Sequence, residues 1–138
     1  MKTILTAKQR IEIAYEYVQS ASCPSMKDLS IKYGISPSTV SKILHESIEN
    51  LQVPRFIAIK IRDTAVANIR KNKKSPYKTM QSFNSSIKIF DYKIKNFKQN
   101  LDFLCIEINK SSYYSSEKLN SLVTQYNKTQ KMYEFLMQ

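Results

Sequence analysis

The chain has 138 residues and a net charge of +11, and this length allows one ordinary domain or a small domain with an extension. Such a charge points to a polyanionic partner, nucleic acid before a membrane surface. The single His45 and the isolated Cys23 and Cys105 exclude zinc-finger spacing, and the single glycine excludes glycine-rich phosphate loops. We therefore expect no metal and no cofactor, and nothing indicates a catalytic site or a small-molecule ligand.

The hydropathy of the chain gives no sign of membrane insertion or export. No window approaches the roughly 18 apolar residues of a membrane span, and the first ten residues lack the apolar run of a signal peptide. We expect a soluble protein of the cytoplasm.

The first predicted helix runs from Ala7 to about Ser20, with Thr6 as its N-cap. Its expected apolar face consists of Ile11, Ala14, Tyr15 and Val18. Pro24 prevents the helix from continuing, and Ser25 with Asp28 fits the capping-box pattern at the start of a second helix.

The stretch from Met26 to His45 is predicted to form two helices joined by a tight turn. Gly34, the only glycine, can adopt the positive φ that ends a helix, and Ser36 followed by Pro37 is a typical helix start. Apolar residues on the inner sides would pack these helices together and onto the first helix: Leu29, Tyr33, Val40, Ile43 and Leu44.

Aligned on Gly34, this stretch resembles the helix-turn-helix of bacterial and phage regulators, resolvases and transposases. The run Gly34 to Lys42 is similar to the G-[VI]-S-x-S-T-V-x-[KR] form of resolvase-type domains and of the small stage III D sporulation regulator. The family's apolar positions are occupied by Leu29, Ile35, Val40 and Ile43, whereas Ser30 replaces the commonest alanine.

This resemblance covers about the first half of the chain and implies that helix 37–46 reads base edges in the major groove of DNA. The residues that it implies for this contact are Ser36, Ser38, Thr39, Ser41, Lys42 and His45. The same pattern also fits a helical hairpin in an unrelated α-protein.

A basic segment follows the motif, with eight basic residues against one acidic residue between Leu51 and Met80. A helix is predicted from Pro54 to about Asn72, with an apolar stripe of Ile57, Ile61, Ala65 and Ile69 that should dock on the first three helices. We expect phosphate contacts from Arg55, Lys60, Arg62, Arg70, Lys71, Lys73, Lys74 and Lys78. The alternative is a solvated basic helix with a flexible linker.

The C-terminal region carries an a/d heptad stripe over more than three heptads. Its members are Phe83, Ile87, Phe90, Ile94, Phe97, Leu101, Leu104 and Ile108. A serine-rich turn precedes a final helix capped by Ser116, with Leu119, Leu122, Tyr126, Thr129, Tyr133 and Leu136 on one face. The stripe is predicted to oligomerise the chain, although packing on the N-terminal domain or a foreign helix would also cover it.

These patterns predict an all-α protein with a trihelical helix-turn-helix domain (1–50), a basic helix and linker (51–79) and a long antiparallel, coiled-coil-like hairpin (80–138). The expected function is sequence-specific binding of double-stranded DNA by a non-enzymatic transcriptional regulator. A homo-oligomer is expected, with a dimer the simplest form. A ring-forming small terminase subunit of a phage and a helical scaffold protein both stay open. As part of a recombinase, the chain would need a catalytic domain from a separate subunit.

Overall fold

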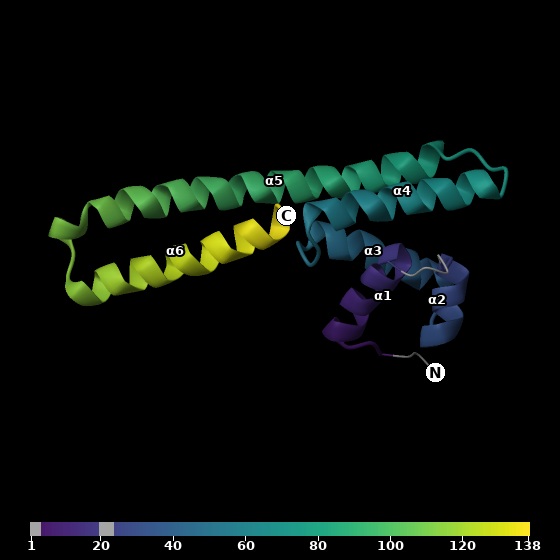
Figure 1. Cartoon of the computed structure of the whole chain (residues 1–138), viewed down its shortest axis with the longest axis horizontal. Coiled ribbons are helices and arrows are strands. Elements are labelled where there is room, and N and C mark those ends of the chain that lie inside the picture. The colour runs from purple at the N-terminus through teal and green to yellow at the C-terminus, as the bar shows by residue number, and fades with distance from the viewer. Residues whose placement is uncertain (1–3, 20–23) are drawn as a thin grey trace. The chain divides into compact units, whose positions relative to one another are not determined.

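The computed structural model describes residues 4–19 and 24–138, and all regular structure in these ranges is helical. The α-helices are α1 (Ala7–Gln19), α2 (Met26–Tyr33), α3 (Pro37–Glu49), α4 (Arg55–Lys71), α5 (Tyr77–Asn109) and α6 (Ser116–Leu136), and a short 3-10 helix, η1 (Ser111–Tyr113), precedes α6 (Figure 1). No helix in the described ranges is long and apolar enough to cross a membrane. The chain divides into two compact units, Met1–Phe90 and Asp91–Gln138.

The first turns of α1 and α2 are capped by Thr6 and Ser25, the residues that the sequence predicted for these positions. The Thr6 hydroxyl accepts the Gln9 N–H at 3.1 Å, and the Gln9 side chain accepts the Thr6 N–H at 2.9 Å. Ser25 and Asp28 make the same reciprocal pair at 3.2 and 3.0 Å, so the predicted capping box is confirmed. The Ser25 backbone N–H stabilises the carboxylate and lowers the pKa of Asp28.

The turn between α2 and α3 depends on Gly34. Its backbone is left-handed, with φ 68° and ψ 36°, and its N–H donates to the Ser30 carbonyl oxygen. A residue with a Cβ would be strained there, which explains why the only glycine stands at this position. Ser36 then caps α3 and Pro37 is its first residue, as predicted.

The core of the first unit forms where α1 packs on α3 and α4 and where α2 packs on α3. The predicted inner residues Leu29, Val40, Ile43 and Leu44 are buried. Tyr33 is half-buried, and its hydroxyl donates to Glu16 at 2.6 Å. This bond lowers the pKa of Glu16, while burial together with the neighbouring carboxylate raises the pKa of Tyr33 to about 12.

The predicted apolar face of α1 is only partly right. The buried residues are Ile13, Ala14 and Tyr17, whereas Ile11, Tyr15 and Val18 are half-exposed. The helix is rotated because α4 covers one side of it, where the Asn68 amide donates to the Tyr17 hydroxyl at 3.2 Å. Ser20, the expected end of this helix, and Cys23 lie outside the described residues.

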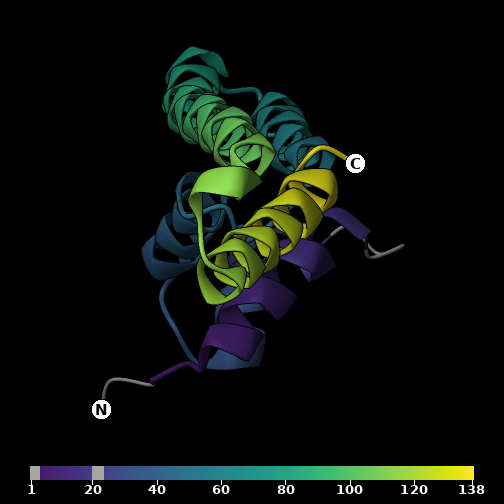
Figure 2. The same cartoon turned by 90° about the vertical axis from the view of Figure 1, so that its left-hand side faces the viewer.

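Helix α4 and the first part of α5 lie side by side and run in opposite directions (Figures 1 and 2). Ile57, Ile61 and Ala65 of the predicted α4 stripe are buried, while Ile69 is half-exposed. Phe83 and Phe90 of α5 are buried in the same unit. The boundary between the compact units falls within α5, because the first unit ends at Phe90 and the second begins at Asp91.

The heptad stripe of α5 is covered within a single chain. Phe83, Ile87, Phe90, Ile94, Leu101 and Leu104 are buried, and Phe97 and Ile108 are half-buried. A side chain that is already buried has little apolar surface left for a second copy. Burial within one chain favours the alternative of packing inside the molecule, and the role of the stripe as an oligomer seam stays a prediction.

In the second unit, α6 runs in the direction opposite to the second part of α5 (Figure 1). Leu122 and Leu136 are buried, and the other predicted members of this face, Leu119, Tyr126, Thr129 and Tyr133, are half-buried. The N-cap is Ser115, one residue before the predicted Ser116, and its hydroxyl accepts the Lys118 N–H at 3.2 Å. Cys105 is a free, exposed thiol.

Candidate nucleic-acid interface

The outer side of α3 presents Ser38 and Lys42 to solvent. The Lys42 side chain is 75% exposed, and its ammonium lies 3.9 Å from a carboxylate oxygen of Glu46, which also pairs with Arg10 at 3.4 Å. Exposed ion pairs of this length contribute little to stability, and salt screens them. The Lys42 ammonium can therefore exchange this carboxylate for another acceptor at little cost.

The first turn of α3 is held together by its own hydroxyl groups. The Ser36 oxygen lies 2.7 Å from the Thr39 hydroxyl and 3.0 Å from the Ser38 hydroxyl, and it accepts the Thr39 N–H at 3.1 Å. Ser36 and Thr39 thus serve first to start the helix. Of this group, Ser38 is the residue whose exposed hydroxyl can turn toward a ligand without removing the cap.

His45 does not belong with the exposed residues of α3. Its ring stacks on Phe83 of α5 at 4.0 Å between centroids and 14° between planes. Its Nδ1 lies 2.8 Å from the Ser86 hydroxyl and its Nε2 lies 3.2 Å from the Ser82 hydroxyl. Burial lowers the pKa of His45 and favours the neutral ring. His45 therefore links α3 to α5, and a base contact by this residue stays a prediction.

The predicted phosphate-binding residues fall into two groups. Arg55 and Arg62 are half-buried and already engaged, since Arg62 donates to Asp63 and to Asn84, each at 3.1 Å. The other six are exposed: Lys60, Arg70, Lys71, Lys73, Lys74 and Lys78. Of these, Lys60 lies near the start of α4, with its ammonium 5.6 Å from the centroid of the Phe56 ring.

The remaining five basic residues gather where α4 ends and α5 begins, and we call Arg70, Lys71, Lys73, Lys74 and Lys78 the basic corner. Arg70 and Lys71 occupy the last turn of α4, where the helix dipole favours cations. Lys73 has a left-handed backbone, with φ 58°, and reverses the chain after the helix. The corner thus concentrates positive charge at one end of the helix pair.

A cavity of about 520 Å³, which we call the interhelical cavity, connects the basic corner with α3. Lys78 of the corner lines it, as do Ser41 of α3 and Lys27 of α2. These three residues are far apart in the sequence, and the fold brings them to one opening. Sequence reasoning missed Lys27, because its spacing from Ser41 and Lys78 has no period that a pattern would show.

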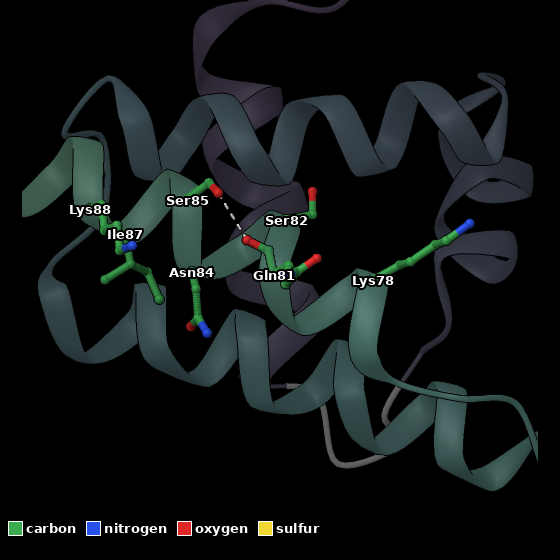
Figure 3. Close-up of a pocket in the computed structure, with 7 residues that line it drawn as sticks. All are labelled: Lys78, Gln81, Ser82, Asn84, Ser85, Ile87 and Lys88. Carbon is green, nitrogen blue, oxygen red and sulfur yellow. Dashed lines mark hydrogen bonds between the residues drawn. The ribbon is translucent and has the colours of Figure 1, made fainter.

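A second hollow follows α5 alone, and Figure 3 shows the side chains that line it. Lys78 and Lys88 lie at its two ends, and the Ser85 hydroxyl donates to the Gln81 carbonyl oxygen at 3.0 Å between them (Figure 3). Because one helix supplies all of these residues, the hollow is an open surface rather than an enclosed site.

Comparison with family models, with curated proteins and with solved structures found no match for this chain. Within the described residues, no group of three or more histidine, cysteine, aspartate or glutamate side chains is placed to hold a metal ion.

Proposed function

We propose that this protein binds double-stranded DNA in the cytoplasm, reads sequence with α3, and acts as a transcriptional regulator rather than an enzyme. The observation that carries this proposal is the exposed side of α3. Ser38 and Lys42 lie on it, and α3 follows a tight turn in which Gly34 has a left-handed backbone. An α-helix fits the major groove of B-DNA, and hydroxyl and ammonium groups can contact base edges there. The helices α1, α2 and α3 would form a trihelical helix-turn-helix domain.

The basic corner supplies the second part of the proposed interface. Its five side chains are exposed, and Lys78 shares the interhelical cavity with Ser41 of α3. A helix in the major groove lies between two phosphate backbones, so cations beside that helix are placed to neutralise phosphates. We assign affinity mainly to the corner and discrimination mainly to Lys42, Ser38 and Ser41.

Self-association remains part of the proposal, through a different surface from the heptad stripe. Phe103 and Ile106 are 58% and 55% exposed. At 100° per residue, they lie on the side of α5 opposite to the buried Leu101 and Leu104. A second copy that covered them would present two reading helices, suited to half-sites about 34 Å apart.

Selection of bound sites from a pool of random duplexes tests this function. We expect enrichment of a short consensus, and a palindromic consensus would support a dimer. Single-stranded oligonucleotides of the same length should bind more weakly than the duplexes. Recovery of random sequence after several rounds, or no binding to any duplex at low salt, would contradict sequence-specific recognition.

A further inference from the structure

The interhelical cavity is lined by both apolar and positively charged side chains. Its apolar part includes Met26, Ala65, Ile69 and Phe83, which come from three helices. Among the described residues, the only ionic side chains on its lining are Lys27 and Lys78, because His45 is favoured in its neutral form and no carboxylate takes part. The cavity therefore joins an apolar wall to two positive charges that no acidic residue of this described lining balances.

The volume suits a small molecule. Ligand sites in proteins commonly measure about 300–1,000 Å³, with mostly apolar walls and a few polar groups that fix orientation. The interhelical cavity falls in this range at about 520 Å³. The amides of Asn68 and Asn72 line it and can orient a bound group by hydrogen bonds.

We propose that the interhelical cavity binds a small organic anion with an apolar body, such as an aromatic or branched aliphatic carboxylate. The acidic group pairs with Lys27 and Lys78, and the apolar body lies against Met26 and Ile69, the half-buried apolar residues of the lining. A phosphate of DNA would satisfy the lysines but would leave the exposed parts of Met26 and Ile69 in contact with water. The free energy of burying these parts therefore favours an organic anion over a bare phosphate.

Occupancy of this cavity is coupled to α3, and this second step rests on the proposed DNA binding. Ser41 and His45 belong to α3 and line the cavity, while Ser82 and Phe83 of α5 line it from the other helix. A ligand that touches both helices selects the spacing between them that fits it best. By linkage, DNA and the ligand must change each other's affinity by the same factor.

The test uses the full chain and the fluorescent anion 8-anilinonaphthalene-1-sulfonate, which has an acidic group on an aromatic body. We expect saturable binding of one probe per chain. The double variant Lys27→Gln/Lys78→Gln should weaken the probe about three- to tenfold, as expected for two partly exposed charge contacts. N-phenyl-1-naphthylamine, which lacks the sulfonate, should bind this variant and the wild type equally.

Two further variants make the result specific to the cavity. Thr79→Trp fills the opening from the first turn of α5 and should abolish binding of both probes, with thermal melting confirming that the variant is folded. Lys88→Gln removes an exposed charge of α5 outside the cavity and should leave both affinities unchanged. Equal weakening by Lys88→Gln, or unchanged binding in the double variant, would overturn the proposed site.

The coupling is measured separately, by titrating a selected duplex with and without the probe. A shift in DNA affinity that is matched by the reciprocal shift in probe affinity supports it, and no shift in either direction rejects it. If the protein bound no duplex, the proposed function would fail while the binding of the anion would still be decided by the probe alone.

Discussion

The imidazole of His45 connects α3 to α5. Burial between Phe83, Ser82 and Ser86 lowers its pKa below the ordinary value of 6.5, and Glu49 opposes this shift only in part. The unfolded chain therefore binds a proton more readily than the folded chain. The contribution of the neutral His45 ring to the free energy of unfolding is fully present above about pH 6.5. It is lost as the pH falls through that value toward the lower pKa of the folded state.

The lowered pKa of His45 predicts a pH effect on stability that one substitution removes. The free energy of unfolding of the wild type, measured by denaturant titration, should fall between pH 7.5 and pH 5.5. In His45→Gln the fall should vanish, because the chain has no other histidine. The pKa values of Asp28 and Glu16 are lowered by folding, so these two carboxylates lose their contributions to stability only below pH 5.5. An unchanged fall in the variant would show that another group is responsible.

Lys42 is the residue of α3 from which we expect the strongest base contact. Lys42→Ala should cost about 1–3 kcal/mol of binding free energy on a selected duplex and little on a random duplex. Fluorescence anisotropy with both duplexes measures this difference. Lys88→Ala, which removes an exposed lysine from α5, is the matched control and should change neither affinity. An equal loss on both duplexes would reassign Lys42 to a phosphate.

At the level of elements, the basic corner joins α4 to α5 and should govern the salt dependence of binding. Replacing Lys71, Lys73 and Lys74 by glutamine should weaken all duplexes similarly. It should reduce the slope of log affinity against log salt concentration by roughly 0.9 for each phosphate that the protein no longer neutralises. The measurement is a series of titrations at several salt concentrations.

Three exposed lysines of α6 offer a control with the same loss of charge. They are Lys118, Lys128 and Lys131. Their replacement by glutamine should leave the slope closer to that of the wild type, because they lie outside the proposed interface. Equal slopes in the two triple variants would mean that net charge, and not the position of the corner, determines affinity.

The ends of elements were predictable because the residues that form them are neighbours in the sequence. Ser25, Gly34 and Ser36 act on backbone groups a few positions away, so their local chemistry appears in the sequence itself. The rotation of α1 was not predictable, since the bond between Tyr17 and Asn68 joins residues 51 positions apart. The partners of His45 escaped prediction for the same reason.

At the level of the whole molecule, the sequence predicts the apolar heptad stripe of α5 but does not predict which residues pack against it. A regular apolar spacing shows that a helix face is buried, and it is the same whether the cover comes from one chain or two. The interhelical cavity was equally hidden, because its lining combines residues of α1 to α5. The sequence thus identified the exposed candidate Lys42 but not the cavity at which the neighbouring Ser41 meets Lys27 and Lys78.

The burial of the stripe predicts how a core substitution behaves on dilution. Leu101→Ala should lower the free energy of unfolding by about 2–5 kcal/mol, because Leu101 is only 7% exposed within one chain. The resulting shift in melting temperature should be the same at low and high protein concentration. Lys98→Ala, at an exposed position on the same helix, should change stability little. A destabilisation by Leu101→Ala that depends on protein concentration would instead place the residue between copies.

The central claim, that α3 enters the major groove, is tested most directly by methylation of a selected duplex with dimethyl sulfate. This reagent modifies guanine N7 in the major groove and adenine N3 in the minor groove, so one footprint reports on both. The wild type should protect guanine N7 within the site and leave adenine N3 reactive, and Lys42→Ala should restore reactivity at a protected guanine. Protection confined to adenine N3, or no protection on a duplex that the protein binds, would contradict the claim.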